Sequence, residues 1–286
     1  MMDYRKSILA VIFTAIAILS AGPGNTADAG IYAVQIPGAG PIMDPTAEFW
    51  NKTPGFQVQM LPQTVTTPAN PNPATKTLIV RAVYNGSWVG IRVEWEDPTQ
   101  SDRIVVDEFG DQVAVEFPVD YKPDELPSPM MGNPGRRVNI WQWRAAFQRD
   151  IEQGEPGVRD LYPNTMVDVY PDEVLRVTDA RAYTGALGVD NLVSHPHGSP
   201  VLEQVAEGFG TLTALPEDQN TNGRGFWQDG KWHVVFTHPL VPFSKNSAQF
   251  AAGGETVAAF AVWEGGQREV GARKAWSNWV PFRLSE

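Results

Sequence analysis

Two neighbouring segments of alternating apolar and polar residues, separated by a turn sequence, limit the fold of this chain more than any other feature. Residues 77–84 (TLIVRAVY) alternate and are rich in β-branched side chains, and residues 88–96 (WVGIRVEWE) alternate again. Between them, Asn85, Gly86 and Ser87 are typical turn residues. Because alternation with period two places one set of side chains on one face of a strand, the pattern predicts an antiparallel β-hairpin with a buried face.

The same pattern recurs along the chain, with many glycines and prolines between short strands. The sequence holds 26 glycines and 24 prolines, and residues 145–152 are the clearest short helix. We therefore predict a mainly β protein, an antiparallel β-sandwich with a few short helices and long loops. Residues 154–210 fit this pattern least and are expected to be long excursions with short strands. The further predicted strands are residues 112–119, 138–143, 231–237, 256–263 and 276–284.

The N-terminal residues have the features of an export signal. Arg5 and Lys6 precede an apolar run over residues 7–21, and Ala27, Asp28 and Ala29 form an A-x-A cleavage site. The apolar run is too short for a convincing transmembrane helix. We predict a secretory signal peptide over residues 1–29 and one domain over residues 30–286. The mature protein is expected in the periplasm, without a membrane span.

Composition excludes several kinds of chemistry. The chain has no cysteine, so disulfides, iron–sulfur clusters and C-x-x-C-H haem attachment are all excluded. A haem would have to be held non-covalently, by axial ligands drawn from Met, His, Lys or Tyr. The formal net charge of −11 argues against nucleic acid and anionic membranes as partners. This charge is compatible with a basic soluble partner, and simple solubility explains it equally well.

A methionine pair on a Gly/Pro-rich loop is the first candidate binding feature. Met130 and Met131 precede a strand that carries Trp141 and Trp143 at alternate positions. A thioether is a soft neutral ligand that binds haem iron, and large aromatic rings could form a wall of its pocket. The alternative is that both methionines fill gaps in an ordinary core.

Lys274 is the second candidate. It stands at the start of the last apolar segment, between Arg273 and Trp276. A lysine at such a place is ordinarily a surface charge. To bind a metal ion it must be neutral, which costs about 4–5 kcal/mol at pH 7 unless burial lowers its pKa.

The histidines give weaker signals. His195 and His197 form an H-x-H pair that could chelate a metal ion, but no acidic triad stands beside it. His233 and His238 are expected to be packed or surface residues of a strand. No nucleophile motif and no dinucleotide-binding glycine loop is present, so nothing in the sequence requires a hydrolase or an independent enzyme.

Three segments resemble a known family. They are PMMGNPGRRVNIWQWRA at residues 129–145, DGKWHVVFTHPL at 229–240 and AAFAVWEGGQREVGARKAWSNWVPFRL at 258–284. They resemble the haem b-binding γ subunits of periplasmic molybdenum enzymes of the DMSO reductase superfamily, such as those of ethylbenzene, dimethylsulfide, selenate and chlorate enzymes. In that family a β-sandwich holds one b-type haem between a methionine that precedes a glycine and a lysine before the last strand. The resemblance implies Met131 and Lys274 as axial ligands, with Met130 as the alternative.

The resemblance also implies a role and partners. With both axial positions filled, the iron can only change oxidation state, so the subunit is an electron relay and not a catalyst. It would dock on an iron–sulfur β subunit beside a molybdenum-cofactor α subunit and exchange electrons with a soluble c-type cytochrome or similar carrier. The competing hypothesis is an exported carbohydrate-binding β-sandwich module without haem. Residues implied to lie near the macrocycle or its propionates are Trp141, Trp143, Trp276, Arg136, Arg137 and Arg273.

Overall fold

The computed structural model describes residues 29–166, 191–194 and 198–286. The predicted signal peptide, apart from Ala29, lies outside the described residues, as do His195 and His197. The strands are β1 (Ile31–Gln35), β2 (Phe56–Gln59), β3 (Leu61–Pro62), β4 (Thr77–Tyr84), β5 (Trp88–Glu96), β6 (Gln112–Pro118), β7 (Val138–Arg144), β8 (Val201–Ala206), β9 (Asn222–Gln228), β10 (Lys231–Pro239), β11 (Glu255–Trp263), β12 (Ala275–Trp276) and β13 (Val280–Leu284).

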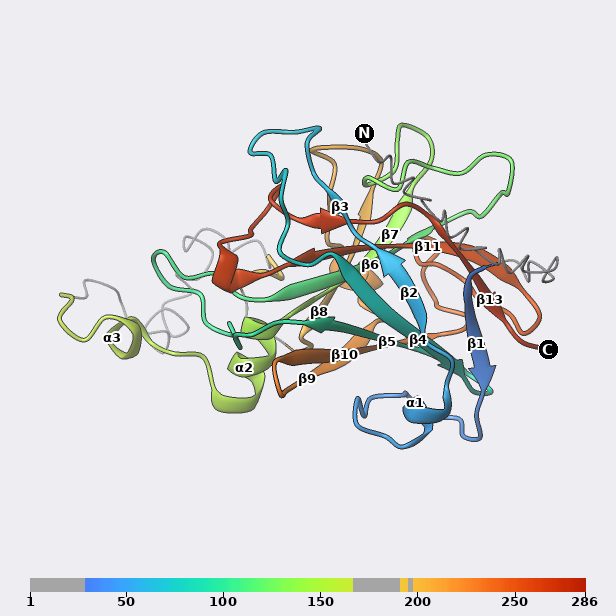
Figure 1. The fold of residues 1–286 in the computed structure, drawn as a ribbon, viewed down its shortest axis with the longest axis horizontal. Coiled ribbons are helices and arrows are strands. Elements are labelled where there is room, and N and C mark those ends of the chain that lie inside the picture. The colour runs from blue at the N-terminus through green and yellow to red at the C-terminus, as the bar shows by residue number, and fades with distance from the viewer. Residues whose placement is uncertain (1–28, 167–190, 195–197) are drawn as a thin grey trace, which may run out of the picture.

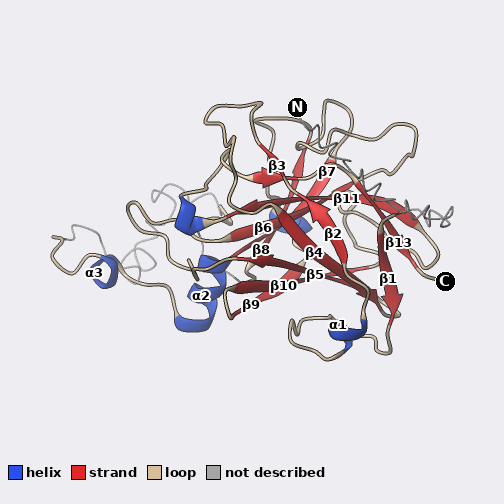
Figure 2. Ribbon diagram, viewed as in Figure 1, coloured by secondary structure: helices blue, strands red, loops and turns tan. Residues whose placement is uncertain are grey.

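The predicted fold class is confirmed: the chain is mainly β, and its few helices lie at the edges of the strands (Figures 1 and 2). The helices are α1 (Phe49–Lys52), α2 (Ala145–Gln153) and α3 (Val158–Leu161), with short 3-10 turns η3 (Pro216–Asp218) and η4 (Gly265–Gln267). No helix among the described residues is long and apolar enough to cross a membrane.

The hairpin predicted from alternation forms β4 and β5, paired antiparallel with Tyr84 opposite Val89. Five strands were not predicted at their positions, namely β1, β2, β3, β8 and β9. β1 pairs in parallel with both β13 and β4, so the sandwich is not wholly antiparallel. The predicted strand at residues 276–284 is divided into β12 and β13, because its register against β11 shifts by one residue. Trp276 pairs with Ala261 and Val280 with Ala258, so three residues, 277–279, lie opposite two.

Two sheets face each other and share one long strand. The order of neighbours is β8-β7-β6-β11-β13-β1-β4-β5-β10-β9. The first residues of β11, 255–258, pair with β13, and the last residues, 259–263, pair with β6. β11 therefore carries the chain from one sheet into the other, as Figure 1 shows.

Aromatic side chains fill the space between the sheets. The rings of Trp143 on β7 and Trp232 on β10 have centroids 4.9 Å apart, and those of Trp141 and Phe236 lie 6.5 Å apart. All four side chains are buried in one core cluster. Because successive residues of a strand point to opposite faces, the neighbours Ile140, Gln142 and Arg144 of β7 face away from this core.

Candidate functional site

A cavity of about 480 Å³ lies on the outer face of the sheet formed by β8, β7, β6 and β11. Its floor includes three alanines, Ala114 on β6 and Ala259 and Ala261 on β11. Ala114 and Ala261 are paired across the two strands, and Ala259 pairs with Glu116. Small side chains at the centre of a sheet face leave room for a flat group to lie against the backbone.

Loops from distant parts of the chain close the cavity. They bring Pro129, Met130 and Met131 from one side and Ile104, Phe209 and Leu212 from others. The last three are exposed apolar side chains at the rim. Both predicted methionines thus line the same cavity, which leaves Met131 and its alternative Met130 open as the binding thioether.

The methionine loop has a constrained backbone. Met131 and Gly132 both have positive φ, 68° and 71°, and the backbone N–H of Gly208 donates to Met131 O at 2.6 Å. A Cβ on Gly132 would lie 2.7 Å from Arg136 O. The Met-Gly order is therefore explained locally: only glycine fits the second left-handed position, and this turn directs Met131 toward the cavity.

Lys274 lines the cavity from the opposite loop, just before β12. Its Nζ lies 5.3 Å from the ring centroid of Trp263, whose indole N–H donates to Gly271 O at 2.8 Å. Burial lowers the pKa of Lys274, and the charge of Glu116 opposes this shift without reversing it. A lowered pKa increases the fraction of neutral amine, the form that binds a metal ion.

Glu116 connects the two predicted ligands. Its side chain lines the cavity, and its Oε1 accepts no hydrogen bond from any described residue. Burial raises the pKa of Glu116, while the charge of Lys274 and the backbone N–H of Met131 oppose the rise. Met131 and Lys274, separated widely in the sequence, therefore both lie beside this carboxyl group.

Arg144 forms a polar end of the cavity and was missed in the sequence. Its Nη2 donates to Gln142 Oε1 at 3.1 Å, but its Nε has no partner among the described residues. Its guanidinium lies 4.8 Å from the ring centroid of Phe147, and burial lowers its pKa to about 10. Strand alternation could have predicted its position on the outer face, since Arg144 must face away from a core that holds Trp141 and Trp143 if the alternate residues of β7 share one face.

The other residues singled out in the sequence are dispersed. Trp141 and Trp143 lie in the core on the far face of β7 and do not line the cavity. Trp276 does line it, and its indole N–H donates to Pro62 O at 2.9 Å. Arg273 is not among the lining residues, although its Nε is buried without a partner among the described residues. Arg136 and Arg137 line a separate surface pocket.

The two described histidines lie away from the cavity. His238 is fully buried, and its ring stacks on Trp141 with the two centroids 4.5 Å apart. Its Nδ1 lies 2.9 Å from Thr221 Oγ1, and its Nε2 lies 3.1 Å from Ala248 O. Burial lowers the pKa of His238 to about 3, so its ring is neutral. His233 Nδ1 is 3.5 Å from Glu94 Oε2. Both match the expectation of packed or surface residues.

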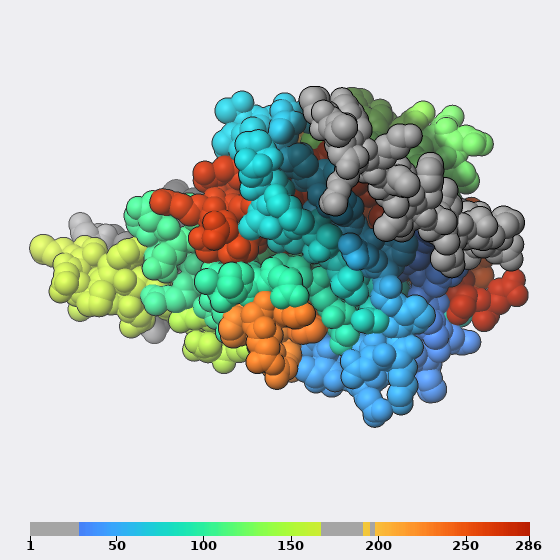
Figure 3. All heavy atoms as spheres, viewed as in Figure 1, coloured from blue at the N-terminus to red at the C-terminus, as the bar shows by residue number. Residues whose placement is uncertain are grey.

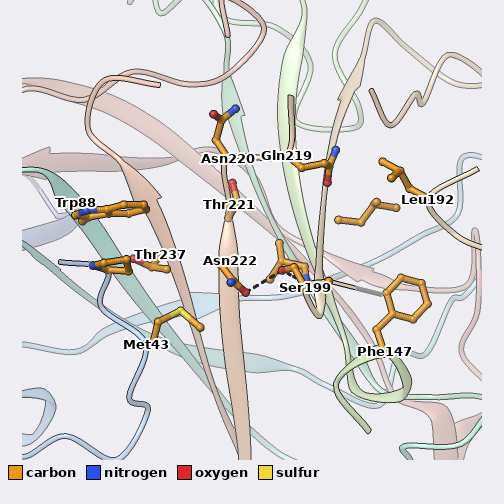
Figure 4. Close-up of a pocket in the computed structure, with 14 residues that line it drawn as sticks. Met43, Trp88, Phe147, Leu192, Ser199, Gln219, Asn220, Thr221, Asn222 and Thr237 are labelled. Carbon is orange, nitrogen blue, oxygen red and sulfur yellow. Dashed lines mark hydrogen bonds between the residues drawn. The ribbon is translucent and has the colours of Figure 1, made fainter. Parts of the chain in front are cut away.

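A second cavity, of about 530 Å³, is drawn in Figure 4. Met43 and Trp88 lie on one side of it, and among its lining residues Ser199 Oγ donates to Asn222 Oδ1 at 2.8 Å. None of its described lining residues is ionisable, and none was predicted to bind a cofactor. The cavity on the outer face is therefore the better candidate site.

The chemistry of that cavity fits a haem. It offers a thioether and an amine, the donor types of the implied ligand pair. Arg144 is a buried guanidinium with an unpaired nitrogen, and such a group favours a carboxylate partner such as a propionate. The alanine floor leaves space for a planar ring system.

The fold and the cavity together define a β-sandwich protein with a loop-covered binding site on the outer face of one sheet. The chain belongs to the family described as ethylbenzene dehydrogenase, whose family model matches residues 47–275. This confirms the resemblance found in the sequence motifs.

Three relatives are similar over most of their length. A protein of Haloferax mediterranei, provisionally named respiratory nitrate reductase haem subunit ORF7, is 26% identical over 96% of this chain and 79% of its own length. The chlorate reductase γ subunit of Ideonella dechloratans is 26% identical over 93% of this chain and 92% of its own length. The dimethylsulfide dehydrogenase γ subunit of Rhodovulum sulfidophilum is 25% identical over 85% of this chain and 75% of its own length.

Among solved structures, a family 9 carbohydrate-binding module from Caldicellulosiruptor kristjanssonii, in complex with glucose, has a TM-score of 0.41 and 10% identity. The match covers 89% of this chain and 95% of the module.

Proposed function

We propose that this chain binds one non-covalent b-type haem in the cavity on the outer sheet face and serves as an electron-transfer γ subunit of an exported molybdenum enzyme. The observation that carries the proposal is that Lys274 and the methionine loop meet around Glu116 in one cavity. The relatives named as γ subunits or as a haem subunit support the same role.

Different residues of the cavity would hold different parts of the haem. Met131 and Lys274 would bind the haem iron through a thioether and an amine, and Arg144 would pair with a propionate. Ala114, Ala259 and Ala261 would leave space for the ring. When bound, the haem would supply a one-electron couple at its iron. With Met131 and Lys274 both holding the group, its role would be electron transfer.

Substitution of the ligands tests this proposal. Lys274→Ala should convert a low-spin haem spectrum toward high spin and shift the potential, because a nitrogen ligand is lost. Met131→Ala should do likewise, and Met130→Ala should have the smaller effect.

Acid–acetone should extract the haem, since the chain has no cysteine to tether it. Absence of a Soret band after reconstitution of the wild-type protein would contradict haem binding.

The partners form a second part of the proposal. We expect an iron–sulfur β subunit and a molybdenum-cofactor α subunit to co-purify from the native source, with a soluble c-type cytochrome or similar carrier as exchange partner. Recovery of the chain alone, with bound glycan and no haem, would support a carbohydrate-binding module instead. Periplasmic localisation is checked by cell fractionation and by N-terminal sequencing, which should find Gly30 as the first residue.

A further inference from the structure

Three carboxylates meet at one end of the sandwich, apart from the haem cavity. Asp97 directly follows β5, Asp111 precedes β6, and Glu264 follows β11. Each offers one oxygen, and these oxygens lie within 4.8 Å of one another. The exposed fractions of the three residues are 0%, 0% and 3%. None of them lines the cavity that holds Lys274.

No basic side chain that the structure describes would neutralise the charge of the cluster when its carboxyl groups are ionised. No Lys, Arg or His among the described residues forms an ion pair with these three groups. Burial, followed by the charge of Asp97, raises the pKa of Asp111 to about 8 and that of Glu264 to about 7. Three buried carboxylates this close together require either bound protons or a bound cation.

An unsatisfied oxygen points to a ligand. Asp97 Oδ2 has no partner at normal hydrogen-bond distance among the described residues, although Asp97 is fully buried. Burial raises the pKa of Asp97, and weaker interactions with the side chains of Trp95 and Asp111 only partly oppose the rise. By contrast, Asp97 Oδ1 accepts from Thr99 N at 3.0 Å. Both oxygens of Asp111 also accept hydrogen bonds, from Gly265 N at 2.8 Å and from Ser101 N at 2.7 Å. A buried carboxylate oxygen without a donor is costly, and a cation would complete it.

Neutral oxygens border the same cluster. Thr99 Oγ1 lies 3.3 Å from Glu264 Oε1 and 3.5 Å from Ser101 Oγ. A Cβ on Gly266 would lie 2.6 Å from Thr99 Oγ1 and 2.8 Å from Glu264 Oε1. Glycine at this position therefore keeps a side chain out of the oxygen-lined space.

We propose that Asp97, Asp111 and Glu264 bind a divalent cation, and that the cation is Ca²⁺. The donors are all oxygens, which hard cations prefer, and the set has none of the nitrogen or sulfur ligands typical of zinc. Oxygens that contact one Ca²⁺ ion at about 2.4 Å can lie up to about 4.8 Å apart. Three carboxylates also exceed the charge of one divalent ion, so they can neutralise it fully.

The site would join the two sheets. β5 belongs to one sheet, while the ends of β6 and β11 belong to the other. Figure 3 shows the segment around Gly265, in red, against the segment after β5, in green. The latter segment carries Ile104 to the rim of the haem cavity. A bound cation would therefore order a wall of that cavity without contacting it.

The test measures metal content and thermal stability of the full chain after dialysis against EDTA. We expect Ca²⁺ to bind at one ion per chain and to raise Tm by about 5–10 °C at a hundredfold excess over Kd. Asp97→Asn should abolish both effects. Asp107→Asn should retain them, because Asp107 lies on the same segment but pairs with Arg268 at the surface, at 2.9 Å.

Glu264→Gln provides a second variant in case Asp97→Asn fails to fold, which circular dichroism reports. Wild-type protein that takes up no Ca²⁺ and shows no Tm shift would overturn the proposal and leave protonated carboxylates as the explanation. An equal response to Mg²⁺ would overturn the assignment to Ca²⁺. An equal response of folded Asp97→Asn and wild-type protein would place the cation elsewhere.

Discussion

At the scale of single residues, the candidate site depends on side chains whose burial changes their chemistry. Lys274 would be an ordinary cation in water, but in the cavity its pKa is lowered. Arg144 remains charged, with a pKa of about 10, and lacks a carboxylate partner among the described residues. Lys274 can therefore become neutral more readily than in water, whereas Arg144 stays charged and can pair with an anion. Both properties follow from the loss of water around the side chains.

Replacing Arg144 separates its role from that of a surface arginine. Arg144→Leu should raise the haem concentration for half-saturation about 10- to 100-fold, because one charge-assisted hydrogen bond is lost. The apoprotein should be no less stable, since an incompletely paired buried charge is removed. Arg136→Leu, outside the cavity, is the control. Haem titration followed at the Soret band measures the affinity, and equal affinities of the two variants would exclude Arg144 as a propionate partner.

Gly132 supports the methionine loop through its backbone. Gly132→Ala should destabilise the apoprotein by about 1–3 kcal/mol, because it combines a left-handed backbone with a close approach to Arg136 O. Gly135→Ala is the matched control: its φ is 76°, yet a Cβ there would meet no atom within 4 Å. Denaturant unfolding measures both. If Gly132→Ala lowers the free energy of unfolding no more than Gly135→Ala does, the close approach to Arg136 O is unimportant for stability.

At the scale of elements, one sheet serves two purposes through strand alternation. β7 directs Trp141 and Trp143 into the core and Ile140, Gln142 and Arg144 onto the outer face. β6 and β11 place alanines on that outer face, where the cavity forms. The core therefore stabilises the sheet independently of the site, and substitutions on the outer face can alter binding without unfolding the protein.

Filling the floor of the cavity tests this separation. Ala261→Leu should reduce haem affinity about tenfold or more, because the added atoms occupy space needed by the ligand. The apoprotein should retain its Tm within a few degrees. Val257→Leu, which lies on the same strand but does not line the cavity, should bind haem as the wild type does. Haem content after reconstitution and the Tm of the apoproteins are the measurements, and unchanged binding by Ala261→Leu would argue against this cavity.

At the scale of the whole molecule, the aromatic core and the shared strand β11 join the two sheets, and the carboxylate cluster lies at one end of the sandwich. That cluster has a predictable effect on stability. Asp111, with a pKa of about 8, and Glu264, with a pKa of about 7, keep protons in the folded state that the unfolded chain releases near pH 4. Above pH 4 the folded state therefore binds more protons than the unfolded state, so stability falls as pH rises toward 8.

In EDTA, the Tm of the wild-type protein should decrease between pH 6.5 and 8, and Asp111→Asn should flatten this decrease. The window begins at 6.5 because His238, whose pKa is lowered to about 3, contributes the opposite slope below its unfolded pKa. Glu116 contributes in the same direction as Asp111, whereas Lys274, whose pKa is lowered, contributes in the opposite direction; both are unchanged in the variant. Calorimetry at several pH values checks the difference, and identical slopes for the two proteins would mean that Asp111 is ionised throughout.

The sequence by itself determined the strand-rich class and the principal hairpin, because alternation and turn residues are local properties of β4 and β5. It also determined the exclusion of thiolate chemistry and pointed to Met131 and Lys274 through short motifs. Only the tertiary structure decided which face of β7 holds the cavity, since alternation separates two faces without saying which one another sheet covers. The meeting of Glu116 with Lys274, and of Asp97 with Asp111 and Glu264, likewise depends on strand pairing between distant segments. Such contacts, and the pKa shifts that burial causes, arise only when the chain has folded.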